Sequence, residues 1–367
     1  MIDKTCFTKE WMDAFRKQKE HSSIQTVVLE KMIYALHLLE LLKTHGLDFV
    51  FKGGTSLLLL LEEGNRFSID IDIISKSERE PLENILKKIV GQSQFTSVSL
   101  DEKRSYKQGV PKAHYIFGFE SVYNPGIPGT LLLDILIEET IYPEVIERPV
   151  QSKWIKTNEL VYVKTPSVDA ITGDKLTAFA PNTIGIPYYK GEEPFTMEIC
   201  KQLYDLGQLF TQVSNMEVVQ KSFYAFAEQE IGYRKQDDAY EDKEITTTAV
   251  LKDIIDTSIL ITKRERNRTE PEKSQFNLMK DGIKKFGTGY LMSGKFRIDE
   301  AIVASARVAH LAAKLLTDDL SPIPTYQGED IQSLLIEDPD WNFLNKLKRQ
   351  PDKSSFYYWY HTVNLLT

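Results

Sequence analysis

The sequence has few cysteines and no long apolar run, and these absences exclude several classes of protein. Cys6 and Cys200 are the two cysteines among 367 residues, so a disulfide framework is excluded and an all-cysteine zinc site is disfavoured. Two thiols without a motif are typical of a reducing cytoplasm, where we expect the protein. The longest apolar run, Leu57–Leu61, is far shorter than the roughly 20 residues that span a bilayer. The N-terminus lacks the basic and apolar regions of a signal peptide, so we expect no membrane partner.

An excess of basic charge is also absent. The formal net charge is -8, so a polyanion would have to be held by a local patch rather than by the whole molecule. Basic runs such as residues 263–268 are interrupted or flanked by acids, and we interpret each as solvated surface. The six histidines, His114 among them, have no metal-binding spacing and are interpreted as structural.

The order of predicted elements indicates an α+β fold: a mixed sheet with flanking helices, followed by a helical C-terminal part. We place the domain boundary so that residues 1–210 form the first domain and residues 211–367 the second. The hydrophobic content of 42% is sufficient for two cores. The predicted strands are 47–51, 67–74, 113–119 and 130–138, the last two forming a hairpin. The predicted helices are 22–45, 55–63, 81–90, 165–180, 196–210, 218–230, 246–261, 299–316 and 340–348.

Two aspartates interrupt the apolar strand predicted over residues 67–74. Alternate residues of a strand share a face, so Asp70 and Asp72 would point away from the core, roughly 7 Å apart along the backbone. Two neighbouring carboxylates repel each other unless a cation lies between them, and Mg²⁺ prefers oxygen ligands. The alternative is an edge strand with a solvated acidic face, although aspartate is disfavoured in strands and two of them need a reason.

A glycine turn precedes this strand. Gly53 and Gly54 separate an apolar strand from an apolar helix, and glycine allows the backbone to approach a ligand closely. Amides at a helix start attract phosphate, and the hydroxyls of Thr55 and Ser56 add donors. The alternative is a tight turn with an N-cap hydroxyl. The spacing fits neither a Walker A loop nor a dinucleotide fingerprint.

A third carboxylate, Asp134, lies within the apolar run of residues 131–137. A buried aspartate is rare unless it is paired or bound to metal. It is a candidate third metal ligand or a general base for an attacking hydroxyl. The alternative, which the residues leave equally open, is an aspartate on the polar face of a half-exposed strand.

Together these motifs resemble the nucleotidyltransferase superfamily, and more narrowly the AbiEii/AbiGii toxin family. The resemblance is dense over residues 50–74, where Phe51–Leu57 and Arg66–Ile73 match the two motifs of the family. Two sparser matches follow: Lys175 in a Lys-Leu-x-Ala context, and Asp205 in a segment where the family has Arg-Asp-x-x-Asp-Leu. In that segment Lys201 replaces the arginine and Gln202 the first acid.

The resemblance implies a nucleotidyltransferase fold and an enzyme that uses Mg²⁺ or Mn²⁺ with a nucleoside triphosphate. It implies metal ligation by the three aspartates, a triphosphate contact from Lys175, and completion of the site by Asp205. It also implies a toxin-like role with an RNA such as tRNA as the acceptor and a cognate antitoxin as inhibitor. The predicted catalytic residues are Asp70, Asp72, Asp134, Lys175 and Asp205, and the predicted substrate-binding residues are Lys52, Gly53, Gly54, Thr55, Ser56, Arg66 and Lys201.

Two hypotheses from different classes follow. The first is a metal-dependent nucleotidyltransferase that transfers a nucleoside monophosphate. The second is a binding module that holds a nucleotide without turnover and acts on a protein partner through the helical C-terminal part. The altered segment at Lys201 and Gln202 keeps the second hypothesis open.

Overall fold

The structure is a computed structural model. It describes residues 1–367 except 19–20, 22–23, 62–65, 67, 106–110, 236–243 and 267–268. The described chain divides into two compact units: residues 1–167 with 290–294, and residues 168–289 with 295–367. Residues 290–294 belong to the first unit because Leu291 pairs with Arg66 and Met292 lies in its core.

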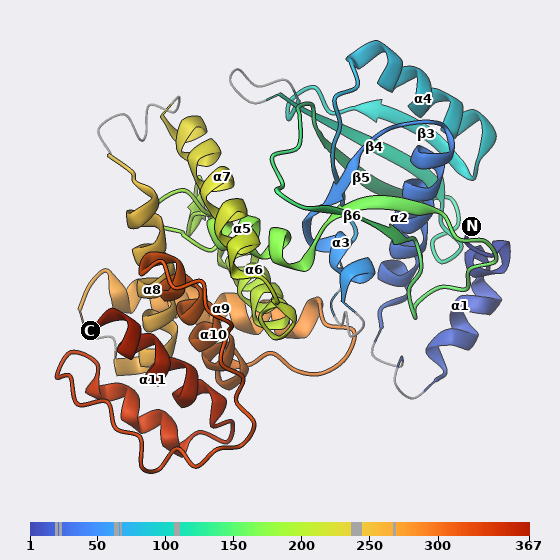
Figure 1. Ribbon diagram of the computed structural model, residues 1–367. Helices are drawn as coiled ribbons and strands as arrows, with labels where there is room; N and C mark the ends of the chain where they lie inside the picture. The colour runs from blue at the N-terminus through green and yellow to red at the C-terminus, as the bar shows by residue number, and fades with distance from the viewer. Residues whose placement is uncertain are drawn as a thin grey trace. The chain divides into compact units, whose positions relative to one another are not determined.

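Within the described residues, seven strands of the first unit form one mixed sheet in the order β3-β4-β5-β2-β1-β7-β6 (Figure 1). β2 lies antiparallel to β1 and parallel to β5, and β4 and β5 form the expected antiparallel hairpin. The α+β class predicted from the sequence is therefore confirmed. The strands are β1 (Val50–Lys52), β2 (Ile71–Ile74), β3 (Phe95–Leu100), β4 (Lys112–Glu120), β5 (Pro128–Leu136), β6 (Val145–Pro149) and β7 (Tyr162–Pro166).

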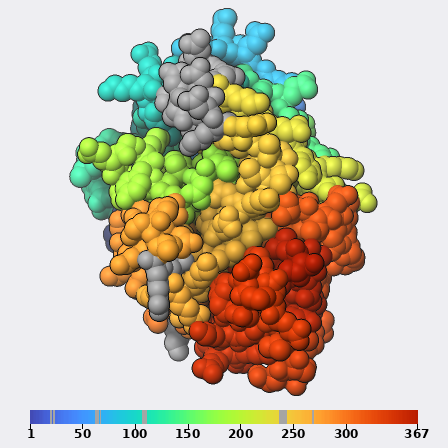
Figure 2. All heavy atoms as spheres, turned by 90° about the vertical axis from the view of Figure 1, so that its left-hand side faces the viewer, coloured from blue at the N-terminus to red at the C-terminus, as the bar shows by residue number. Residues whose placement is uncertain are grey.

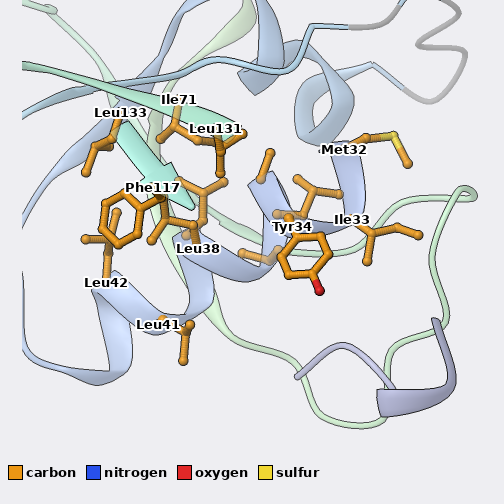
Figure 3. Packing of buried hydrophobic residues seen from close by; sticks show 14 of the residues in the cluster. Met32, Ile33, Tyr34, Leu38, Leu41, Leu42, Ile71, Phe117, Leu131 and Leu133 are labelled. Carbon is orange, nitrogen blue, oxygen red and sulfur yellow. The ribbon is translucent and has the colours of Figure 1, made fainter. Parts of the chain in front are cut away.

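One long helix supplies the core of the first unit. α2 (Thr26–Thr44) is apolar along most of its length, and its buried side chains pack on the sheet. Figure 3 shows Leu38 and Leu42 of this helix beside Phe117, Leu131 and Leu133 of the hairpin. The other helices of the unit are η1 (Lys4–Phe7), α1 (Lys9–Arg16), α3 (Gly53–Leu60) and α4 (Arg79–Gln92).

The predicted start of one strand in this unit was wrong. The second strand begins at Ile71, not at 67, because β1 ends at Lys52 where Gly53 opens α3, and the paired register stops at Lys52 and Asp72. Asp70 therefore precedes the strand. Phe67, the predicted first residue of this strand, lies outside the described residues. So does Gly64, where the helix predicted over residues 55–63 was expected to end.

The predicted start of the helix at 165–180 was also wrong. Thr165 and Pro166 end β7 instead of capping a helix, and α5 begins at Val168. Both residues pair with β6, so tertiary pairing overrides the predicted helix start.

The second unit is helical apart from a two-stranded ribbon within its described residues. α10 contacts α6, α8 and α11, and Figure 2 shows the C-terminal residues, in red, on the surface beside the orange helical segment. The predicted segment 340–348 is a 3₁₀ helix, η6 (Asn342–Arg349), and two helices were not predicted, α9 (Glu272–Gly289) and α11 (Ser354–Leu366). The remaining elements are α5 (Val168–Ala178), β8 (Tyr189–Lys190), β9 (Glu193–Pro194), α6 (Thr196–Leu209), η3 (Phe210–Gln212), α7 (Met216–Arg234), α8 (Thr247–Lys263), η5 (Arg264–Arg266) and α10 (Ile298–Leu316).

Among the residues that the structure describes, no helix combines the length and the apolar character needed to cross a membrane.

A buried histidine in α10 predicts acid sensitivity of folding. His310 is 2% exposed, and burial, followed by the nearby Lys314 ammonium, lowers its pKa from 6.5 to about 3. The unfolded chain takes up a proton below about pH 6.5 while the folded protein does not, so the free energy of unfolding falls as pH drops below 6.5. At pH 5 the expected loss is about 2 kcal/mol. Urea unfolding at pH 7.5 and 5.0 measures it, and His310→Phe should reduce the loss by a similar amount. An equal loss in both proteins would contradict the prediction.

Candidate active site

Four polar side chains lie in one transverse row across the sheet of the first unit. Lys52 of β1 pairs with Asp72 of β2, Asp72 pairs with Asp134 of β5, and Asp134 pairs with His114 of β4. Paired residues of neighbouring strands share a face of the sheet. The four side chains therefore lie on one face, which we call the polar row.

The opposite face explains this placement. Each of three row residues directly follows an apolar residue in its strand: Phe51, Ile71 or Leu133. All three apolar residues belong to the core against α2. Because successive strand residues alternate between faces, burying these apolar side chains directs Lys52 and Asp72 away from the core.

The glycine turn lies directly against the polar row. Gly53 has a φ of +77°, and a Cβ at this position would lie 2.2 Å from Oδ2 of Asp72. A Cβ on Gly54 would lie 2.4 Å from an Nη atom of Arg66, whose side chain is buried. A side chain at either position would displace one of these groups, so the first amides of α3 lie beside a carboxylate and a guanidinium group.

The two hydroxyls that follow the glycines hold the turn together. Oγ1 of Thr55 donates to the backbone carbonyl of Asp70 at 2.6 Å, and Oγ of Ser56 donates to the carbonyl of Gly53 at 2.8 Å. Both side chains are buried. The Thr55 bond fixes the segment that enters β2 against the helix start. A contact of the Thr55 and Ser56 hydroxyls with a substrate stays a prediction.

Asp70 and Asp72 differ in their surroundings. Asp70 is exposed at the entry to β2, whereas Asp72 is half-buried within the strand. Among the described residues, no three histidine, cysteine, aspartate or glutamate side chains form a cluster that could hold a metal. Mg²⁺ is commonly held by one or two carboxylates together with substrate phosphates. A pair of aspartates beside a glycine turn fits that kind of site.

Asp134 is held at both carboxylate oxygens. Nδ1 of His114 lies 2.7 Å from Oδ1, and Nη2 of Arg104 lies 3.5 Å from Oδ2. Sequence reasoning missed both partners. The hairpin register offered a signal for His114, because pairing outward from the predicted turn brings residue 114 opposite residue 134. No local signal pointed to Arg104. His114 is therefore a candidate positioning residue for Asp134.

The second unit brings together the other predicted residues. Lys175 of α5 donates to Oδ2 of Asp205 of α6 at 2.8 Å and to Oε1 of Gln202 at 3.1 Å. Lys175 is 5% exposed and Asp205 1% exposed. Lys201 donates to Glu198 one turn before it, at 2.8 Å. Asp205 of α6 thus pairs across two helices with the buried Lys175 of α5.

The fold is that of a nucleotidyltransferase-like protein. The family model described as "Nucleotidyl transferase AbiEii toxin, Type IV TA system" matches residues 38–286, more than half of the chain. The chain therefore belongs to the AbiEii nucleotidyltransferase toxin family, as the sequence motifs predicted.

One solved structure agrees with this fold. The chain is similar to the nucleotidyltransferase toxin MenT4 from Mycobacterium tuberculosis H37Rv, with 16% identity, a TM-score of 0.50, and coverage of 86% of this chain and 90% of that chain. A putative nucleotidyltransferase from H. pylori matches with 17% identity and a TM-score of 0.33, over 66% of this chain and 97% of that chain. A comparison with curated protein sequences gives no match.

The contact between Gly53 and Asp72 predicts that Gly53→Ala damages the site beyond backbone strain. Gly46 is the matched control, because its φ is +88° and a Cβ there meets nothing within 4 Å among the described residues. Alanine at a left-handed position costs about 1–2 kcal/mol, which we expect for Gly46→Ala. Gly53→Ala should cost more and should weaken triphosphate binding by roughly tenfold, about 1.4 kcal/mol. Urea unfolding and calorimetry measure both. Equal behaviour of the two variants would contradict the prediction.

The buried pair in the second unit predicts a large stability loss for Asp205→Ala. Removing the carboxylate leaves the Lys175 ammonium buried without its anion, which costs about 3–5 kcal/mol. The control is Glu217→Ala, which removes an exposed partner of Lys221 at 4.0 Å and should cost at most about 1 kcal/mol. Urea unfolding compares them, and similar small losses would show that the pair is unimportant to folding.

Proposed function

We propose that the chain transfers a nucleoside monophosphate from a nucleoside triphosphate to a hydroxyl group of an RNA such as tRNA. We further propose that it acts as the toxin of a cytoplasmic toxin–antitoxin pair and is restrained by a cognate antitoxin. The observation that carries the proposal is the contact of the glycine turn with Asp72, which places helix-start amides next to a carboxylate.

The glycine turn would bind the phosphates. Amides at the start of α3 favour anions, and the helix dipole adds to that preference. The Arg66 guanidinium against Gly54 would neutralise phosphate charge with a planar set of donors. Lys52, whose ammonium lies 5.7 Å from the Tyr142 ring, would add a second positive charge on the same face.

Asp70 and Asp72 would hold Mg²⁺ or Mn²⁺. Such an ion would neutralise the negative charge that develops on the phosphate groups. The paired carboxylates supply the oxygen ligands that hard cations prefer. Asp70 would remain in position because Thr55 holds its backbone carbonyl.

Asp134 would accept the proton of the attacking hydroxyl. The acceptor oxygen forms a bond to the α-phosphorus, the bond to pyrophosphate breaks, and the hydroxyl proton passes to the carboxylate. His114 and Arg104 would fix the orientation of that carboxylate. A role of Asp134 as third metal ligand remains the other prediction for this residue.

A contact of Lys175 with the triphosphate stays a prediction, and within the second unit Asp205 would orient the Lys175 ammonium. Lys201, paired with Glu198, stays a predicted substrate contact. The distance of 2.8 Å and the burial of both Lys175 and Asp205 support a positioning role for the aspartate.

A non-catalytic nucleotide-binding module is the second candidate. The observation that favours it is the burial of Lys175, whose ammonium already bonds Asp205 and Gln202. Triphosphate binding by calorimetry without release of pyrophosphate would support this candidate over transfer.

Loss of one carboxylate tests the proposed reaction. We expect the wild-type protein to transfer label from a mixture of labelled triphosphates to total RNA with Mg²⁺, and Asp72→Asn to reduce the rate at least roughly 100-fold, about 2.7 kcal/mol. The control is Glu83→Gln, which alters a half-buried acid paired with Arg79 on α4, outside the polar row, and should keep full activity. Circular dichroism confirms that both variants fold. No transfer by the wild type, or equal transfer after Asp72→Asn, would contradict the proposal.

A further inference from the structure

A cleft of about 570 Å³ opens on the first unit next to the polar row. Its lining comes from β1, β2, β6 and β7 and from the segment after β5, all within the first unit. Val50, Ile74 and Val145 supply apolar surface. Val50 and Ile74 are buried but lie outside the core cluster that packs on α2. That cluster includes the adjacent strand residues Phe51 and Ile73.

The sheet register places this cleft one row from the carboxylates. Val50 pairs with Ile74 and with Lys164, and Lys164 pairs with Glu147. Val50 precedes Lys52 by two residues and Ile74 follows Asp72 by two, so both share the face of the polar row. Two residues of strand span roughly 7 Å, a short step compared with a nucleotide.

The cleft and the glycine turn lie on opposite sides of the polar row. Along β1 the chain passes Val50 in the cleft, Lys52 in the row, and then Gly53 in the turn. In an in-line displacement, the attacking and leaving oxygens lie on opposite sides of the phosphorus. If the turn holds the departing pyrophosphate and the row holds the α-phosphate, the attacking hydroxyl approaches from the cleft.

The charges of the cleft favour a nucleoside over a triphosphate. Three acids, Asp48, Glu138 and Glu147, line it together with two lysines, Lys76 and Lys164. Lys164 bonds Asp48 at 2.6 Å and Lys76 pairs with Glu139, so both ammonium groups already have anions. Carboxylates accept hydrogen bonds from ribose hydroxyls, and an apolar floor suits the face of a base.

We propose that this cleft binds the terminal nucleoside of the RNA acceptor. The proposal rests on the proposed transferase function and adds the place of its second substrate. The hydroxyl of the terminal ribose would point from the cleft towards the polar row. There it would bond to the α-phosphorus, release pyrophosphate towards the turn, and lose its proton to Asp134.

A blocked cleft tests the proposal by separating the two substrates. Val145→Trp fills the cleft from a half-exposed position of edge strand β6, and Leu160→Trp adds the same side chain at an exposed position outside it. Initial rates with total RNA and labelled triphosphates give a KM for each substrate. We expect Val145→Trp to raise the KM for RNA at least roughly tenfold (about 1.4 kcal/mol) and to leave the KM for triphosphate within twofold. Leu160→Trp should match the wild type.

A second variant and a binding measurement keep the test decisive. Glu147→Trp blocks the same face from an exposed position if Val145→Trp fails to fold. Anisotropy of a fluorescent random RNA tetramer with a free 3′ end reports acceptor binding without turnover. If the wild-type protein transfers no nucleotide but either variant weakens tetramer binding tenfold, the cleft proposal is supported and the transferase proposal is refuted. A rise in the triphosphate KM alone, or no change in either KM and in tetramer binding, would overturn the cleft proposal.

Discussion

The pleat of the central strands is the constraint on which the candidate site depends. Phe51 and Ile71 are buried against α2, so Lys52 and Asp72, one position further along their strands, face the other side. The same alternation in β5 brings Asp134 into line with Asp72. Moving any of these strands by one residue would bury a charged group and expose an apolar one. The apolar core therefore fixes the register of the polar row.

The glycine turn depends on the same register. Gly53 fits only because it lacks a side chain where the carboxylate of Asp72 lies, and Gly54 has the same relation to Arg66. The hydroxyl of Thr55 then ties the helix start to the entry of β2. A turn, a helix start and a strand are thus joined by contacts within a few ångströms. Such a preorganised group of amides and carboxylates suits the binding of phosphate with a cation.

The second unit uses a different physical device. Lys175 and Asp205 are both buried, and each charge would be costly without the other. Gln202 accepts a second hydrogen bond from the ammonium. The residue that departs from the family pattern at this position therefore has a structural partner. In the first unit, the pair of Asp134 and His114 likewise gives a carboxylate a fixed orientation, here at a half-buried site.

The sequence alone determined the motifs, the hairpin and the class of fold, because each depends on residues close together in the chain. Alternation around Asp72, the two glycines and the turn between β4 and β5 are local signals of this kind. Only the tertiary structure decided which of the other strands pair, and pairing set the start of β2 at Ile71 and drew Pro166 into β7. It also decided the partners of Lys175, which lie 27 and 30 residues away in the chain. Those contacts arise from packing between elements, and no local propensity specifies them.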